Sequence, residues 1–117
     1  MELNEIAARL NLKDLTPELD SGKGAEISRG HASDLLSDVL ANAPDGGLLV
    51  TIQVHMNVIA VAVHAGLAAV IFASGRGPDE TVREKAVEEG IHLYVSEETT
   101  FDVAGQLYSM GLRGRHA

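Results

Sequence analysis

The first ten residues place apolar side chains at the spacing of a helix. Leu3, Ile6, Ala7 and Leu10 stand at positions i, i+3, i+4 and i+7, which puts them on one face of a short helix. The polar stretch that follows carries a proline, a glycine and several charges, and it is expected to be a loop with a short strand. We predict that this N-terminal segment, residues 1–24, packs on a domain formed by the rest of the chain.

From residue 25 onward, strand-like and helix-like patterns alternate. Residues 67–73 are a continuous run of small and β-branched apolar residues, which is typical of an interior parallel strand. One helix is predicted to begin at Pro78, a residue typical of the first helical position, and to end just before Gly90. Another is predicted to be capped by Thr99, with Asp102 three residues later. The expected elements are a strand at 25–31, a helix capped by Ser33 and ending near 43, a strand at 48–53, a helix at 56–65, a strand at 67–73, a helix at 78–89, a strand at 91–95 and a helix at 100–110.

The connections between these elements are short, and residues 44–47 read Pro-Asp-Gly-Gly, which is strong turn chemistry. Alternation of strands and helices with short connections is the pattern of a parallel sheet flanked by helices. The sequence therefore predicts an α/β fold: a compact single domain with a mostly parallel central sheet of about four to five strands.

Composition narrows the function classes. The 117 residues fit one domain, and the absence of cysteine excludes disulfides, thiolate nucleophiles and cysteine-ligated metals. A formal net charge of −8 disfavours nucleic acid as a partner. Polar residues break the apolar stretch 48–73 into pieces shorter than a membrane-spanning helix of about 20 residues, so no membrane partner is expected. The first ten residues do not read as a signal peptide, and we expect a cytoplasmic protein.

The carboxyl ends of parallel strands are where ligands gather in open α/β sheets. The loop at 53–57 is the strongest candidate, because Gln53, His55 and Asn57 supply polar groups and no Asp or Glu opens the next helix. Its amide donors and positive dipole end would then be free for an anion. The alternative is structural: Asn57 caps the helix, and His55 is half-buried at a strand end.

Other candidates give weaker patterns. Gly75-Arg76-Gly77 lacks the third glycine of a dinucleotide fingerprint and is predicted to be a tight turn, with Arg76 free to pair with an anion, with Glu98 or with a partner chain. Asp34 and Asp38, four residues apart, favour a helix-dipole role over a paired-carboxylate site. His55 and His64 point to opposite sides of a helix, so no metal site is predicted. Nothing selects a catalytic nucleophile, and no cofactor is expected.

The chain resembles a known family. The run from Gly30 to Ala41 contains Ser-Asp-Leu-Leu-Ser-Asp, and Thr51-Ile52-Gln53, His55, Asn57, Gly75-Arg76 and Pro78-Asp79 follow it. Together these residues are similar to the DRTGG domain, over about residues 25–112, with 113–117 left as a basic tail that is expected to fray. Of the namesake element only Gly30 fits, since Gly24, Ala25, Ser28 and Arg29 occupy its other places. The resemblance implies a fold like the amino-terminal domain of HPr kinase/phosphorylase, found alone or beside CBS domains. It carries over the regions Ser33–Asp38 and Gln53–Asn57, and Ser33 and Asp34 join the candidate ligand-binding residues.

The resulting hypothesis is a non-catalytic module that regulates by sensing a ligand and by dimerising, with a nucleotide as one candidate ligand. The homodimer is inferred from the helix at 56–65, which is apolar on nearly every face and needs more cover than one small domain supplies. A regulated protein partner is also expected. Two alternatives stay open: a small anion- or nucleotide-binding enzyme with its site at 53–57, and an interaction adaptor without a small ligand.

Overall fold

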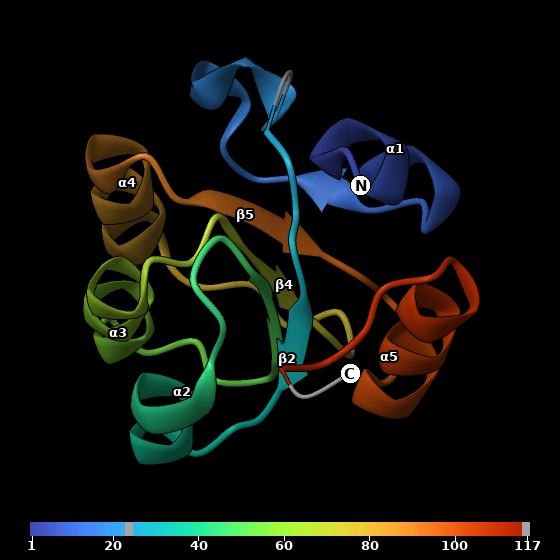
Figure 1. Cartoon of the computed structure of the whole chain (residues 1–117). Coiled ribbons are helices and arrows are strands. Elements are labelled where there is room, and N and C mark those ends of the chain that lie inside the picture. Colours follow the sequence, from blue (N-terminus) through green and yellow to red (C-terminus); the bar gives the residue numbers. More distant parts are fainter. Residues whose placement is uncertain (23–24, 116–117) are drawn as a thin grey trace.

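The computed structural model describes residues 1–22 and 25–115, which fold into five strands and five α-helices (Figure 1). In chain order the elements are α1 (Leu3–Arg9), β1 (Lys13–Asp14), the 3₁₀ helix η1 (Pro17–Gly22), β2 (Gly30–Ala32), α2 (Leu36–Asn42), β3 (Leu48–Thr51), α3 (Asn57–Ala65), β4 (Ala69–Phe72), α4 (Glu80–Glu89), β5 (His92–Val95) and α5 (Thr100–Ser109). The predicted α/β fold with a mostly parallel sheet is confirmed.

The five strands lie in the order β1-β5-β4-β3-β2. Strands β2 to β5 are parallel, and β1 pairs antiparallel with β5 at one edge, which leaves β2 at the other edge. Because each right-handed crossover joins neighbouring strands, α2, α3 and α4 form one layer, while α1 and α5 cover the opposite face (Figure 1). The parallel strands follow the chain order without reversal, so the sheet lacks the switch-point crevice in which doubly wound folds bind ligands.

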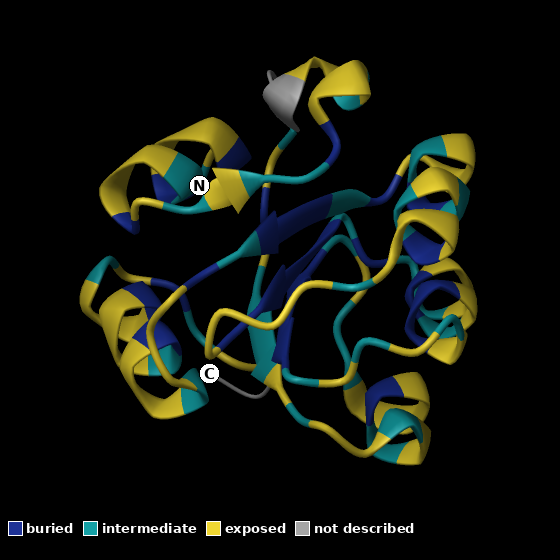
Figure 2. Cartoon of the chain, turned by 180° about the vertical axis from the view of Figure 1, so that it is seen from behind, coloured by how far each residue is buried: buried dark blue, intermediate teal, exposed yellow. Residues whose placement is uncertain are grey.

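Two hydrophobic layers sandwich the sheet, and Figure 2 shows the buried strands between helices whose outer faces are exposed. The layer under α1 and α5 includes Leu3, Ile6, Val50, Ile71, Tyr94, Val103 and Leu107. The layer under α2, α3 and α4 includes Val39, Leu49, Val58, Ile59, Phe72, Val82 and Leu93. The segment 1–22 is part of this core through α1, which buries Leu3 and Ile6.

The most apolar helix, α3, is covered within the chain. It lies between α2 and α4 (Figure 1) and buries Val58, Ile59 and Ala62, whereas Val63 remains 43% exposed. The neighbouring helices therefore bury most of the apolar surface of α3 that was predicted to be buried by a second copy of the chain.

Several element boundaries differ from the predictions. The strand expected at 25–31 begins only at Gly30, and helix α2 begins at Leu36 without a side-chain cap. Ser33 does not cap that helix; its Oγ accepts the N–H of Leu35 (3.2 Å) within the turn. Helix α4 starts at Glu80, because the carboxylate of Asp79 accepts the N–H of Val82 (3.0 Å) and caps it. Thr99 caps α5 by accepting the N–H of Asp102, as predicted.

A half-buried imidazole gives the fold a pH dependence. Burial lowers the pKa of His92, only partly offset by the nearby carboxylate of Asp14, and its Nδ1 has no hydrogen-bond partner among the described residues. Because the folded-state pKa lies below the unfolded value, His92 supports stability above about pH 6.5 and that contribution is lost as the pH falls further. We expect the melting temperature to drop less between pH 7.5 and pH 5.5 in His92→Leu than in the wild type. An equal drop in both would contradict this assignment.

Candidate functional site

The loop at 53–57 follows β3 and is open to solvent. Gln53, His55 and Asn57 are all exposed, and Gln53 and His55 line a shallow depression of about 510 Å³. The other wall of this depression is formed by the start of α4 with Asp79, Thr81 and Val82. Asn57 does not line it. The structure therefore brings two of the three predicted loop residues together.

The hydrogen bonds of this loop do not favour an anion. The N–H of Asn57 donates to Nδ1 of His55 (3.1 Å), and the N–H of Val58 donates to the His55 carbonyl (2.9 Å). His55, and not Asn57, therefore satisfies the first amide of α3, so the prediction of free helix amides is wrong at this position. The prediction that His55 is half-buried is also wrong. The carboxylate of Asp79 adds negative charge to the opposite wall, which disfavours a phosphate there.

The loop after β4 is a tight turn, as predicted. Ser74 and Gly75 have positive φ angles of 61° and 68°, and their N–H groups donate to the carbonyls of Glu98 and Ser96, each at 2.7 Å. Arg76 is exposed and forms no ion pair with Glu98 or any other described residue. The bonds of Ser74 and Gly75 tie the end of β4 to the segment that follows β5. No residue of the loop 74–77 lines the depression at 53–57.

Asp34 is a structural bridge between two strand ends. It precedes helix α2, so the prediction of a helix face shared with Asp38 is wrong. One carboxylate oxygen of Asp34 accepts both the hydroxyl of Thr51 and the N–H of Ile52, each at 2.9 Å. These bonds fix the turn after β2 to the end of β3, and they leave Ser33 and Asp34 apart from the lining of the loop depression.

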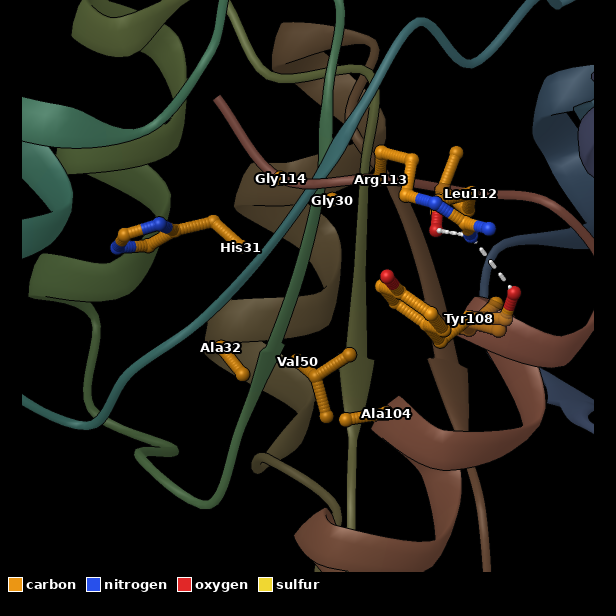
Figure 3. Close-up of a pocket in the computed structure, with 10 residues that line it drawn as sticks. Gly30, His31, Ala32, Val50, Ala104, Tyr108, Leu112, Arg113 and Gly114 are labelled. Atoms are coloured by element: carbon orange, nitrogen blue, oxygen red, sulfur yellow. Dashed lines mark hydrogen bonds between the residues drawn. The ribbon is translucent and has the colours of Figure 1, made fainter. Parts of the chain in front are cut away.

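A second pocket lies at the open edge of the sheet, between β2, α5 and the segment that follows α5 (Figure 3). It has a volume of about 150 Å³ and is mostly apolar. Its lining residues are Gly30, His31, Ala32, Val50, Ala104, Leu107, Tyr108, Leu112, Arg113 and Gly114. The His31 side chain lies on the far side of β2 from Tyr108 (Figure 3), so β2 contributes mainly backbone to the pocket.

Glycine at position 30 lets the segment after α5 pack against β2 and border the pocket. A Cβ at this position would lie 3.0 Å from the side chain of Leu112, so only glycine lets the segment after α5 pack against β2 without a shift. The N–H of Gly30 donates to the carbonyl of Arg113 (2.9 Å). Hydrogen bonds hold residues 113–115 of the predicted tail to the domain. His116 and Ala117 lie outside the described residues.

Arginines gather around this pocket. The guanidinium of Arg113 stacks 3.7 Å from the centre of the Tyr108 ring and donates to the Tyr108 carbonyl (2.8 Å). Arg29 donates to the carbonyl of Gly114 (2.9 Å), and Arg115 donates to the carbonyl of Ala41 (3.2 Å). Three of the six arginines of an acidic chain thus belong to the segment that follows α5 or bond to it. We call Arg29, Arg113 and Arg115 the basic rim.

The far side of β2 is held by a hydrogen bond between two side chains. Nε2 of His31 lies 2.8 Å from the carboxylate of Asp38 on α2. Hydrogen bonds from Asn42 and from His31 lower the pKa of Asp38 to about 2, so this carboxylate is ionised at neutral pH. The pair fixes α2 against β2 and thereby positions the edge strand that borders the pocket.

The sequence contained a signal for this pocket that the motif search did not use. Arg113 and Arg115 form the only basic cluster of the chain, and Ala104 and Tyr108 are four residues apart on one face of the last helix. Of the positions matched to the DRTGG element, Gly24 lies outside the described residues, whereas Gly30 lines the pocket and Arg29 donates to the carbonyl of Gly114, which also lines it. Within the described residues, no three histidine, aspartate or glutamate side chains are placed to hold a metal, and no helix is long and apolar enough to cross a membrane.

Comparisons with known proteins give one informative match. No protein-family model matches the chain, and no curated protein matches its sequence. Among solved structures, the chain is similar to the CBS and DRTGG domains of the regulatory region of a Clostridium perfringens pyrophosphatase, in complex with its activator diadenosine tetraphosphate. The TM-score is 0.68 at 12% sequence identity, and the match covers 89% of this chain and 44% of that one. The resemblance to the DRTGG domain is confirmed at the level of the fold.

Proposed function

We propose that this chain is a regulatory module without catalytic activity, which senses a nucleotide in the pocket between β2 and α5. The observation that carries the proposal is the combination of an apolar pocket with a basic rim in a chain of net charge −8. An apolar cavity takes up a ring, and arginines pair with phosphate, so the two together match the two halves of a nucleotide. The pyrophosphatase region of similar fold has a dinucleotide as its activator, which places adenine nucleotides first among the ligands to test.

The arrangement favours binding over catalysis. The basic rim and Tyr108 donate or stack but supply no general base, and the His31–Asp38 pair lies across β2 from Tyr108. A general base must reach the proton that it abstracts, to about 3 Å or through one water. An enzyme at the 53–57 loop is the less favoured alternative, because its depression is shallow and carries an acidic wall.

A thermal-shift panel of adenine, guanine and pyrimidine nucleotides tests the proposal. A ligand at 100 times its dissociation constant stabilises a protein by about 2.7 kcal/mol, which raises the melting temperature of a domain of this size by roughly 10 °C. We expect such a shift in the wild type and a smaller one in Arg113→Gln. Arg76→Gln is the matched control, since it removes the same charge from an exposed arginine outside the pocket.

Two results would count against the proposal. A panel without any shift would remove nucleotide sensing and leave the adaptor as the function to pursue. A shift that is lost in His55→Ala but kept in Arg113→Gln would move the site to the 53–57 loop.

The proposal includes self-association into a homodimer. Its support is the set of exposed apolar side chains, Leu35, Leu40, Val63, Phe101 and Tyr108, of which Phe101 is 85% exposed. Sedimentation velocity at increasing concentration should show a dimer in the wild type, and Phe101→Glu should weaken it. A wild-type monomer at tens of micromolar or above would contradict this part and leave the ligand site untouched.

A further inference from the structure

The open edge of β2 presents an ordered pair of backbone groups. Strand β2 pairs in register with β3, Gly30 opposite Leu48 and Ala32 opposite Val50. On the β3 side, the carbonyl of Arg29 accepts the N–H of Leu48 (2.9 Å), and the N–H of Ser33 donates to the carbonyl of Val50 (3.2 Å). In a parallel ladder these bonds come from the residues that flank each paired position, so the backbone groups of Gly30 and Ala32 point away from β3.

The bond made by Gly30 supports this orientation. Its N–H donates outward, to the carbonyl of Arg113. Within the described residues, 1–22 and 25–115, the tail occupies one group of the edge and no other backbone group bonds to the carbonyl of Gly30 or the N–H of Ala32, two residues that line the pocket. Along an extended strand, the C=O of one residue and the N–H of the next residue but one lie side by side on the same edge.

This pair is complementary to the N6 edge of a 6-aminopurine. Adenine carries a donor, the exocyclic N6 amino group, beside a ring nitrogen that accepts, whereas guanine and hypoxanthine carry an O6 acceptor at that position. The N6 amino group would donate to the carbonyl of Gly30, while the ring nitrogen accepts the N–H of Ala32. A 6-oxopurine held with its ribose and phosphate in the same place would set its O6 against the Gly30 carbonyl, which places two acceptors face to face.

The surroundings suit a ring in this position. Val50 and Ala104 form an apolar surface with the phenol of Tyr108 nearby (Figure 3), and Leu107 also lines the pocket. A cavity of about 150 Å³ is known to hold one aromatic ring, and this one is open at its mouth, so a larger base can project outward. Of the basic rim, Arg113 lines the pocket and Arg29 bonds to Gly114 of its lining, so two cations lie beside the pocket for phosphates.

We infer that the pocket selects 6-aminopurine nucleotides, and that the carbonyl of Gly30 and the N–H of Ala32 read the base. This inference rests on the proposed function and adds to it the identity of the base and the backbone groups that recognise it. No side chain is needed for the selection, which explains why the sequence shows no nucleotide motif at this position.

The test compares AMP with IMP by isothermal titration calorimetry on the wild type. The two ligands share ribose and phosphate and differ at C6, so the basic rim treats them alike. One good pair of hydrogen bonds to a base discriminates by roughly tenfold or more, so IMP is expected to bind at least about tenfold more weakly than AMP. Equal affinities would overturn base selection while leaving nucleotide sensing intact, whereas absence of binding by either nucleotide would overturn both.

Ala32→Pro tests the backbone donor. The substitution removes an N–H that points away from β3, so the ladder is kept, and proline is tolerated on edge strands. Ala32→Ser retains the N–H and is the matched control. We expect AMP to bind about tenfold more weakly to Ala32→Pro and normally to Ala32→Ser; equal binding to both would overturn the role of Ala32. Circular dichroism without ligand checks the fold, and if Ala32→Pro does not fold, the comparison of AMP with IMP decides alone.

Discussion

Phe72→Ala is expected to lower the free energy of unfolding by about 3–5 kcal/mol. Phe72 is fully buried at the end of β4, with Thr51 and Val95 as its neighbours in the sheet, and its ring packs into the layer under α2, α3 and α4. Truncation leaves a cavity at the centre of that layer, because the strands on both sides cannot move inward without breaking their ladders. Urea denaturation followed by circular dichroism measures the effect.

Phe101→Ala, measured at a protein concentration at which the wild type is monomeric, is the matched control for this prediction. The same side chain is removed, but Phe101 is 85% exposed on α5, so the change in stability of the monomer should stay within about 0.5 kcal/mol. Comparable losses in the two variants would show that the burial assigned to β4 is incorrect.

Gly47→Ala is the second substitution with a large expected effect. A Cβ at this position would lie 2.7 Å from the carbonyl oxygen of Pro44 and 2.9 Å from that of Arg29. Both are backbone atoms, and the Arg29 carbonyl also accepts the N–H of Leu48, so neither can yield cheaply. We expect a loss of about 1–3 kcal/mol, measured by the same urea titration.

The control for Gly47 has the opposite sign. Gly105 lies in the middle of α5, and a Cβ there meets nothing within 4 Å. Because glycine in a helix is less stable than alanine by roughly 0.5–1 kcal/mol, Gly105→Ala should stabilise the chain by that amount. A neutral or stabilising Gly47→Ala would contradict the close approach of the Pro44 and Arg29 carbonyls to Gly47 in the turn before β3.

Periodicity predicted the fold well because each α/β unit carries its own signal. The run 67–73 identified a central strand, and Gly90 and Thr99 marked ends of helices that the structure keeps. The errors fell where a tertiary contact overrides a local preference. Ser33 and Asp34 look like the start of a helix, but Asp34 is bound to Thr51 and Ile52 of another strand end, which delays α2 until Leu36.

The candidate site was harder to predict, for two physical reasons. At the 53–57 loop, polar residues suggested a ligand, yet His55 bonds to the amide of Asn57, a local contact that the residue types alone do not reveal. At the edge of β2, the groups that we propose for recognition are the backbone of Gly30 and Ala32, which any sequence would supply. Only the topology shows that β2 is an edge strand and that the tail reaches it after α5.

Titration of ¹⁵N-labelled protein with AMP, followed by two-dimensional NMR, tests the central claim most directly. The account predicts that the amide signals of residues 30–33, 104–108 and 112–114 shift with AMP, while those of residues 53–57 stay in place. Shifts confined to residues 53–57, or no shifts at millimolar AMP, would contradict it.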